Sequence, residues 1–175
     1  MTGIDPRRFV FLDETGAKTN MTRAFARSRK GERAVDYAPY GHWNTTTLIA
    51  GITLDCAIAP MVLDGPMDTL AFEAYLKHVL IPELPTGSIV VMDNLSSHKS
   101  RKVGVLLRDA GAELIYLPPY SPDFNPIEQM WSKVKSYLRS AKARTQDDLY
   151  QAIAGALSTI SPNDTRGFFG AASYL

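Results

Sequence analysis

The stretch RFVFLDETG, residues 8–16, decides how this chain folds. Its apolar run, residues 9–12, predicts a short buried strand that ends at an acid, Asp13. The same arrangement recurs where the apolar run of residues 89–92 ends at Asp93. If the two strands are parallel neighbours, both carboxylates emerge at the same sheet edge, where ligands of α/β proteins commonly bind. A single acid after a strand often only opens a turn, so the inference depends on the pair.

A third acid, Glu128, lies in the segment SPDFNPIE, residues 121–128. A helix is expected to begin at Asn125, which places Glu128 in its first turn, where it could face the same sheet edge. A purely structural interpretation is also available. Asn125 as N-cap, Pro126 at the first helical position and Glu128 at the third form a variant of the capping box. The sequence leaves both interpretations of Glu128 open.

Three converging carboxylates repel one another, and a bound divalent cation removes that repulsion. A ligand set made only of oxygen favours Mg²⁺, with Mn²⁺ as a substitute, over zinc, and no histidine or cysteine cluster competes. Two such ions about 4 Å apart can activate an attacking hydroxyl and stabilise the leaving oxygen of a phosphodiester. The hypothesis is therefore nuclease or strand-transfer chemistry at Asp13, Asp93 and Glu128.

The remaining pattern predicts an α/β fold, a mixed five-stranded sheet flanked by helices, with three antiparallel strands followed by parallel strands. The expected strands are residues 8–13, 23–35, 45–54, 88–92 and 112–117. Helices are expected from the N-cap Asp68 to Pro82, over residues 97–110, from Asn125, and from the N-cap Thr145. No linker or repeat divides the chain, so residues 1–175 are expected to form one domain.

Composition excludes several classes of protein. With 45% hydrophobic and 21% charged residues the chain can build a core, which excludes a disordered protein. No apolar stretch approaches the roughly 20 residues that cross a bilayer, so no membrane association is expected. The one cysteine, Cys56, forms no internal disulfide and is expected to be buried in a cytoplasmic protein. A net charge of +1 argues against binding nucleic acid through bulk charge and leaves local basic patches open.

Two local basic sets are candidates for contacts to DNA phosphates. The first contains Arg27, Arg29, Lys30 and Arg33, and the second follows Glu128 and contains Lys133, Lys135, Arg139, Lys142 and Arg144. Each set also has an ordinary structural interpretation. The first would be a charged edge strand that prevents sheet-to-sheet association, and the second a solvated helix face.

Three further residues lie close in sequence to the acids: Glu14, Asn94 and His98. They are predicted to orient the carboxylates or bound waters. Glu14 can equally point to the other sheet face, because adjacent strand residues alternate, and His98 can be an ordinary residue at a helix start. Trp43 and Trp131 are expected to pack in the core rather than to stack on bases.

These motifs together resemble the DDE-type transposases of bacterial insertion sequences, in the branch related to mariner elements. FLDETG at residues 11–16, VMDN at residues 91–94 with HK at 98–99, and LPPYSP at residues 117–122 leading into NPIE and Trp131 are similar to the three catalytic segments of that family. Residues 39–51, which include PYGHW and AG, add a fourth similar stretch. Between Asp93 and Glu128 lie 34 residues, the spacing associated with this branch.

The resemblance implies a ribonuclease-H-like fold and a role for each acid. Asp13 would bridge two metal ions, and Asp93 and Glu128 would each hold one. Water and then the 3′-hydroxyl of the transposon would act as nucleophiles, with no covalent enzyme intermediate. The implied substrates are double-stranded DNA with terminal inverted repeats and a TA target. The implied setting is a homo-oligomer on DNA in the bacterial cytoplasm, associated with the nucleoid.

The first catalytic strand begins within ten residues of Met1, so no N-terminal helix-turn-helix domain is expected in this chain. A separate or frameshift-fused helix-turn-helix polypeptide would then recognise the transposon ends. The alternative function is a catalytically silent or regulatory DNA-binding remnant of a transposase. A phosphatase of the haloacid-dehalogenase type is disfavoured, because that chemistry needs a second Asp two positions after Asp13, where this chain has Thr15.

Overall fold

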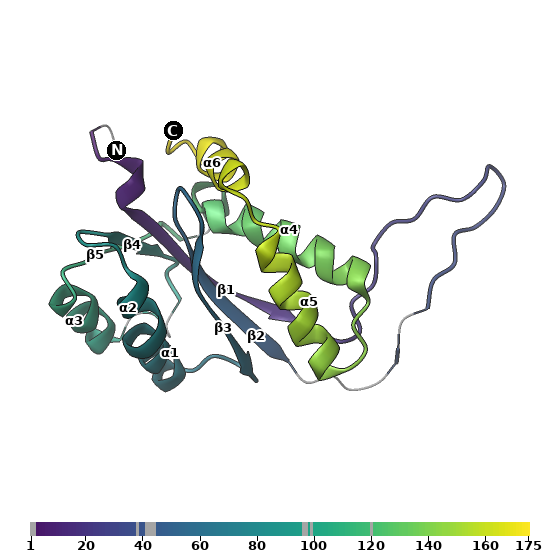
Figure 1. Cartoon of the computed structure of the whole chain (residues 1–175), viewed down its shortest axis with the longest axis horizontal. Coiled ribbons are helices and arrows are strands. Elements are labelled where there is room, and N and C mark those ends of the chain that lie inside the picture. The colour runs from purple at the N-terminus through teal and green to yellow at the C-terminus, as the bar shows by residue number, and fades with distance from the viewer. Residues whose placement is uncertain (1–2, 38, 41–44, 96–97, 99, 120) are drawn as a thin grey trace.

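The computed structural model describes residues 3–37, 39–40, 45–95, 98, 100–119 and 121–175. A five-stranded mixed sheet with the order β3-β2-β1-β4-β5 forms its centre (Figure 1). The strands are β1 (Phe9–Ala17), β2 (Thr46–Ile52), β3 (Ala57–Asp64), β4 (Ile89–Met92) and β5 (Glu113–Tyr116). β2 pairs antiparallel with β1 and β3, and β4 pairs parallel with β1 and β5. The predicted five-stranded mixed sheet is confirmed.

The register of β1 and β4 positions Asp13 and Asp93. The expectation that the first strand ends at Asp13 is wrong, because β1 continues to Ala17 through its pairing with β2, beyond the last residue paired with β4. These strands are parallel, and Leu12 is paired with Met92. Asp13 and Asp93 are the residues that follow this pair, so they lie side by side where β4 ends. The apolar residues before them are fully buried because β1 and β4 are central strands with helices on both faces.

Helices cover both faces of the sheet (Figure 1). One face carries α1 (Thr69–Tyr75), the π-helical turn η2 (Leu76–Leu80), α2 (Ile81–Glu83) and α3 (Arg101–Asp109), whose core includes Leu12, Phe72 and Val103. The other carries α4 (Pro126–Ala141), α5 (Gln146–Ser158) and α6 (Pro162–Ala171), whose core includes Phe11, Trp131 and Phe169. Single 3₁₀ turns, Pro6–Arg8 and Pro122–Phe124, precede β1 and α4. No helix in the described part of the chain is long and apolar enough to cross a membrane.

Several expected helix boundaries are confirmed and others are wrong. Asp68 and Thr145 cap α1 and α5 with their side chains. Pro82 does not end the first helix, because the chain passes through η2 and continues to Glu83, with the proline in the first turn of α2. The helix expected over residues 97–110 is α3, which begins only at Arg101, where the hydroxyl of Ser100 caps it. The C-terminal α6 is absent from the sequence-based prediction.

The strand expected over residues 23–35 is wrong. That segment has no regular structure, because its many charged residues do not alternate with apolar residues that a sheet face could bury. The third member of the antiparallel group is instead β3, which follows β2 through a tight turn. Pro60 lies within β3 and is tolerated because β3 is an edge strand. Cys56, expected to be buried, is exposed in the turn between β2 and β3.

Residues 18–37 form an extended arm, called here the basic arm, which projects beyond the connection between α4 and α5 (Figure 1). Basic residues of the α4–α5 connection hold both of its ends. Arg144 donates to the backbone carbonyls of Thr19 and Met21, at 2.9 and 3.1 Å. Lys142 Nζ lies 2.6 Å from Asp36 Oδ2. Two residues of the second basic set therefore anchor the arm that carries the first set.

Gly51 permits the close packing of β2 against β3, which can be tested by substitution. A Cβ at Gly51 would lie 3.0 Å from Ile58 Cγ1 and 3.2 Å from Val10 Cγ1. We expect Gly51→Ala to lower the free energy of unfolding by about 1–3 kcal/mol through overpacking. The control is Gly104→Ala in α3, where a Cβ meets nothing within 4 Å, and which should stabilise the protein by about 0.5–1 kcal/mol. Urea denaturation measures both, and an unchanged Gly51→Ala midpoint would contradict this packing.

Candidate active site

The three predicted acids line one hollow at the end of β4, beside the middle of β1. The hollow measures about 480 Å³, and Asp13, Asp93 and Glu128 line it together with Asn94 and Asn125. Asp13 comes from β1, Asp93 follows β4, and Glu128 comes from the first turn of α4. The prediction that α4 packs over this edge is confirmed. Asn94 lines the same hollow, and its role in orienting carboxylates or waters stays a prediction.

Asp13 is buried, with 8% of its surface exposed. The indole N–H of Trp131 donates to its Oδ2 at 3.1 Å. Burial is the main cause that raises the pKa of Asp13 to about 7. The negative charges of Glu128 and Asp93 also raise it, and the hydrogen bonds from the Glu14 N–H and from Trp131 lower it. The chain therefore holds a carboxyl group at this edge under electrostatic conditions that favour a cation beside it.

Asp93 is fixed by a buried histidine. His98 Nδ1 donates to Asp93 Oδ1 at 2.7 Å, and His98 Nε2 donates to Glu14 Oε1 at 2.9 Å. The imidazole has no exposed surface and stacks on Phe72, with ring centroids 4.3 Å apart. The predicted alternation holds, because Glu14 points to the face opposite Asp13, yet it reaches the site through His98.

The two carboxylates keep His98 in its charged form. Burial alone would lower the pKa of His98, but the hydrogen bonds to Asp93 and Glu14 outweigh it and raise the pKa to about 9. Burial likewise works to raise the pKa of Asp93, but the hydrogen bonds from His98 and the Leu95 N–H and the charge of His98 together outweigh it and hold that pKa below the usual value. At neutral pH an imidazolium therefore joins two carboxylates, and Asp93 stays ionised.

Asn125 and Glu128 do not form the capping box that the sequence permits. Asn125 occupies the N-cap position of α4, and Pro126 the first helical position, but the Asn125 side chain makes no capping hydrogen bond. The backbone N–H of Glu128 donates to the backbone carbonyl of Asn125 at 3.1 Å, and that of Asn125 donates to Pro122. Glu128 is exposed toward the hollow. The structural interpretation of Glu128 is therefore not supported.

The possible metal ligands in this hollow are oxygen atoms, and oxygen ligands suit a hard divalent cation. They come from Asp13, Asp93, Glu128 and the Asn94 amide. The ring of His98 is occupied by Asp93 and Glu14, so it does not compete as a ligand. Within the described residues, no three histidine, cysteine, aspartate or glutamate side chains are close enough together to hold an ion as they stand. The three acids line one hollow, but their carboxylates do not lie within coordination distance of one common point.

Sequence reasoning missed two contributions to this site. Trp131 was expected only to pack, and it packs in the core while also donating to Asp13. Phe72 supports the ring of His98 from α1. The helical spacing of Trp131 marks a buried stripe but gives no sign of a polar partner 118 residues earlier. Trp43 lies outside the described residues, as do Gly41, His42, Lys99 and Tyr120.

The predicted DNA contacts fall into two groups. Arg27, Arg29, Lys30 and Arg33 are exposed in the basic arm. Lys133 instead donates to Asp164 at 2.7 Å and to the Thr159 carbonyl at 3.0 Å, joining α4 to the α5–α6 turn. The ammonium group of Lys133 therefore already has two partners within the protein. Its contact with DNA stays a prediction. Lys135 is partly exposed on α4.

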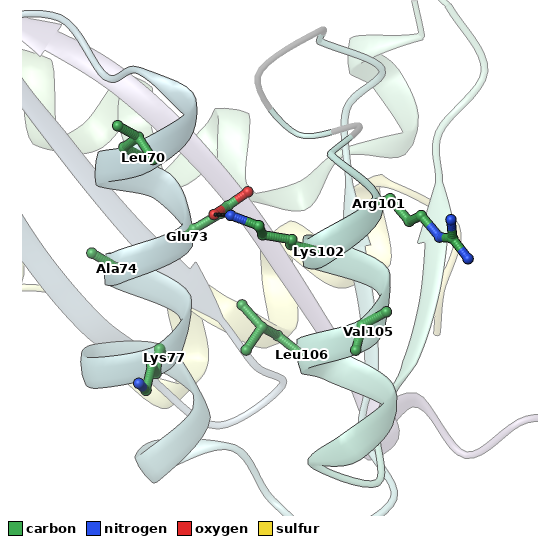
Figure 2. A pocket seen from close by; sticks show the side chains of 8 residues that line it. All are labelled: Leu70, Glu73, Ala74, Lys77, Arg101, Lys102, Val105 and Leu106. Atoms are coloured by element: carbon green, nitrogen blue, oxygen red, sulfur yellow. Dashed lines mark ion pairs between the residues drawn. The ribbon is translucent and has the colours of Figure 1, made fainter.

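A second hollow, of about 540 Å³, lies between α1 and α3 and away from the acids (Figure 2). Its floor is apolar, with Leu70, Val105 and Leu106, and its one acid, Glu73, is paired with Lys102 at 3.4 Å. Glu73 also accepts from Ser100 at 2.6 Å. With a single carboxylate that already has partners, this hollow lacks the converging acids of the sheet edge.

Comparison with known families gives a match over most of the chain. A family model described as DDE superfamily endonuclease matches residues 8–150. The Tcb1 transposase of Caenorhabditis briggsae is 26% identical over 124 residues, which cover 68% of this chain and 45% of that protein. The chain thus spans less than half the length of this relative.

Solved structures share the fold. The pre-cleavage Mos1 transpososome aligns with a TM-score of 0.76 and 16% identity, covering 94% of this chain and 52% of that chain. The Mos1 mariner paired end complex with Mn aligns with a TM-score of 0.75 and 18% identity, covering 95% and 52%. At these identities the likeness shows the fold, the ribonuclease-H-like arrangement that the resemblance of the motifs implies.

The imidazolium of His98 predicts a pH dependence of stability in the metal-free protein. Because folding raises the His98 pKa from about 6.5 to about 9, its contribution is complete below about pH 6.5 and is lost as pH rises through about 9. We expect a loss on the order of 3 kcal/mol in the free energy of unfolding over that range. The raised pKa of Asp13 adds a second loss of stability with rising pH, and that loss ends near pH 7.

Urea denaturation in the presence of a chelator between pH 7 and pH 9.5 measures this loss. His98→Gln should flatten the profile, and His78→Gln, at an exposed histidine, should keep the parent profile. A His98→Gln protein that folds and loses stability with the parent slope would contradict the charged state of His98.

Proposed function

Because the chain belongs to the DDE superfamily endonucleases, we propose that it cleaves DNA and joins DNA strands in the transposition of an insertion sequence. The single observation that carries this proposal is the convergence of Asp13, Asp93 and Glu128 on one hollow. Two parallel strands and one helix start, far apart in sequence, deliver three carboxylates to one place. A purely structural role offers no reason to bury Asp13 beside two other acids.

The carboxylates of Asp13, Asp93 and Glu128 would hold two divalent cations, Mg²⁺ with Mn²⁺ as a substitute, and Asp13 would bridge them. When bound, such ions activate an attacking hydroxyl and stabilise the leaving oxygen of a phosphodiester. Trp131 fixes the orientation of Asp13, and His98, held by Glu14, fixes that of Asp93. Outer partners of this kind hold ligands in position and tune their basicity.

Water and then a DNA 3′-hydroxyl would be the nucleophiles, and each attack would be a direct displacement at phosphorus. The leaving oxygen departs as a 3′-hydroxyl in the first step, and one phosphodiester replaces another in the second. No covalent enzyme intermediate forms, so no serine or cysteine nucleophile is needed. Neither step consumes a nucleotide cofactor.

The proposed substrate is double-stranded DNA with terminal inverted repeats, and the proposed target is a TA dinucleotide. The Mos1 mariner paired end complex, whose fold this chain shares, supports the proposal of paired transposon ends as substrate, on which a homo-oligomer would act. The basic arm and Lys135 would contact backbone phosphates and position the scissile bond. Recognition of the end sequence by a helix-turn-helix polypeptide, separate or frameshift-fused, is part of the same proposal. The proposed setting is the bacterial nucleoid.

Glu128→Gln tests the catalytic assignment. We expect the variant to keep the parent fold and to lose more than about 100-fold in Mg²⁺- or Mn²⁺-dependent nicking of supercoiled DNA, beyond the loss typical for an outer partner of a metal. The reason is that Gln keeps the size of the side chain but not the anionic ligand. Asp93→Asn should behave alike.

The matched control is Asp123→Asn, at an exposed acid five residues before Glu128. It should nick DNA at the parent rate. Equal nicking by the parent and a folded Glu128→Gln protein would remove the basis for the catalytic assignment.

The basic arm is tested separately through the salt dependence of DNA binding. Replacing Arg27, Arg29 and Lys30 by Gln should weaken binding and lower the slope of log K against log salt by about 2–3, because each phosphate contact releases counterions. Mn²⁺ affinity should not change. The control is Lys77→Gln, at an exposed lysine on the opposite layer of the sheet. An unchanged salt slope in the triple variant would exclude the arm from the DNA interface.

A further inference from the structure

Asn125 has a side chain that the fold does not explain. It occupies the N-cap position of α4, where asparagine is favoured because its side-chain oxygen accepts from a backbone N–H of the first turn. Here that hydrogen bond is absent, and the Glu128 N–H is satisfied by the backbone carbonyl of Asn125. A residue with no polar side chain could make the same backbone contact. Helix capping therefore does not account for the amide.

The amide is also costly where it lies. Asn125 is 95% buried, and its Oδ1 has no hydrogen-bond partner among the residues that the structure describes. It is the only buried side-chain polar atom in that part of the chain without a partner. An unsatisfied buried acceptor costs about 1–3 kcal/mol. The same residue lines the hollow that holds Asp13, Asp93 and Glu128.

The chemistry of the hollow makes a water held by a cation a suitable partner. A carbonyl oxygen needs a hydrogen-bond donor, and both ionised carboxylates and DNA phosphates are acceptors only. Water held by a divalent cation is a donor, and Mg²⁺ usually keeps several of its waters when it binds to protein carboxylates. Rotation about the terminal torsion of Asn, which is broad and roughly two-fold, can turn the oxygen toward the hollow.

We infer that Asn125 is a positioning residue of the cation site, whose amide oxygen accepts a hydrogen bond from a water held by the cation that Glu128 binds. The inference rests on the proposed function, because it requires a divalent cation at the three acids. Asn125 lies one helical turn before Glu128 on the same rigid element. The pair would therefore fix a carboxylate ligand and a water of one cation from a single helix start.

Mn²⁺ binding without DNA tests this inference. Free Mn²⁺ is followed by electron paramagnetic resonance at pH 8, where Asp13 is ionised. Asn125→Leu, similar in size and without a polar atom, should bind Mn²⁺ about 10–100-fold more weakly than the parent, the loss typical for an outer partner of a metal. The same variant should be at least as resistant to urea as the parent, because it removes an unsatisfied buried acceptor.

Asn125→Asp keeps an acceptor of the same size and should bind Mn²⁺ at least as tightly as the parent. It also keeps the test decisive if Asn125→Leu does not fold, since weaker binding by a folded Asn125→Asp protein would overturn the inference. Asp123→Asn should match the parent. Parent-like affinity in Asn125→Leu would also overturn the inference.

The comparison with Glu128→Gln separates this inference from the proposed function. If the parent binds Mn²⁺ and Glu128→Gln does not, the cation site stands, and parent-like Asn125→Leu binding refutes only the role of Asn125. If the parent fails to bind Mn²⁺, or if Glu128→Gln binds it equally well, both the cation site and the role of Asn125 are refuted.

Discussion

The parallel pairing of β1 with β4 is the constraint on which the site depends. Leu12 and Met92 are paired, so the acids that follow them emerge together. A slip of one residue would turn every side chain of a strand to the opposite face of the sheet. The side chains on both faces of these strands are packed in the core, so a slip would require both layers to repack. The hydrophobic core therefore fixes the relative position of two carboxylates that would otherwise repel each other.

The two helical layers then act on the acids from opposite faces. From the α4 layer, Trp131 donates to Asp13 and Glu128 enters the hollow. From the α1 layer, Phe72 supports His98, which joins Glu14 to Asp93. The alternation of Asp13 and Glu14 along β1 makes this possible, since each reaches a different layer. Consecutive residues of one strand thus connect the site to both halves of the core.

Much of this arrangement is predictable from the sequence. Two apolar runs that end in acid predict central strands, and the order of elements predicts a mixed sheet. The third antiparallel strand was misplaced to residues 23–35. The true strand, β3, contains Pro60, which a strand tolerates only at an edge, and edge position is not visible in the sequence. The hydrogen-bond partners of Trp131, Lys133 and Arg144 could not be predicted either. Each joins residues at least 26 positions apart, and nothing in local spacing encodes them.

Anomalous diffraction from crystals of this chain soaked in Mn²⁺ tests the central claim most directly, because it locates the ion without depending on activity or on DNA. We expect anomalous density in the hollow at the end of β4 and beside the middle of β1, within coordination distance of the carboxylates of Asp13, Asp93 and Glu128. Density at any other carboxylate, such as Glu73 in the hollow between α1 and α3, with none at the three acids would contradict it.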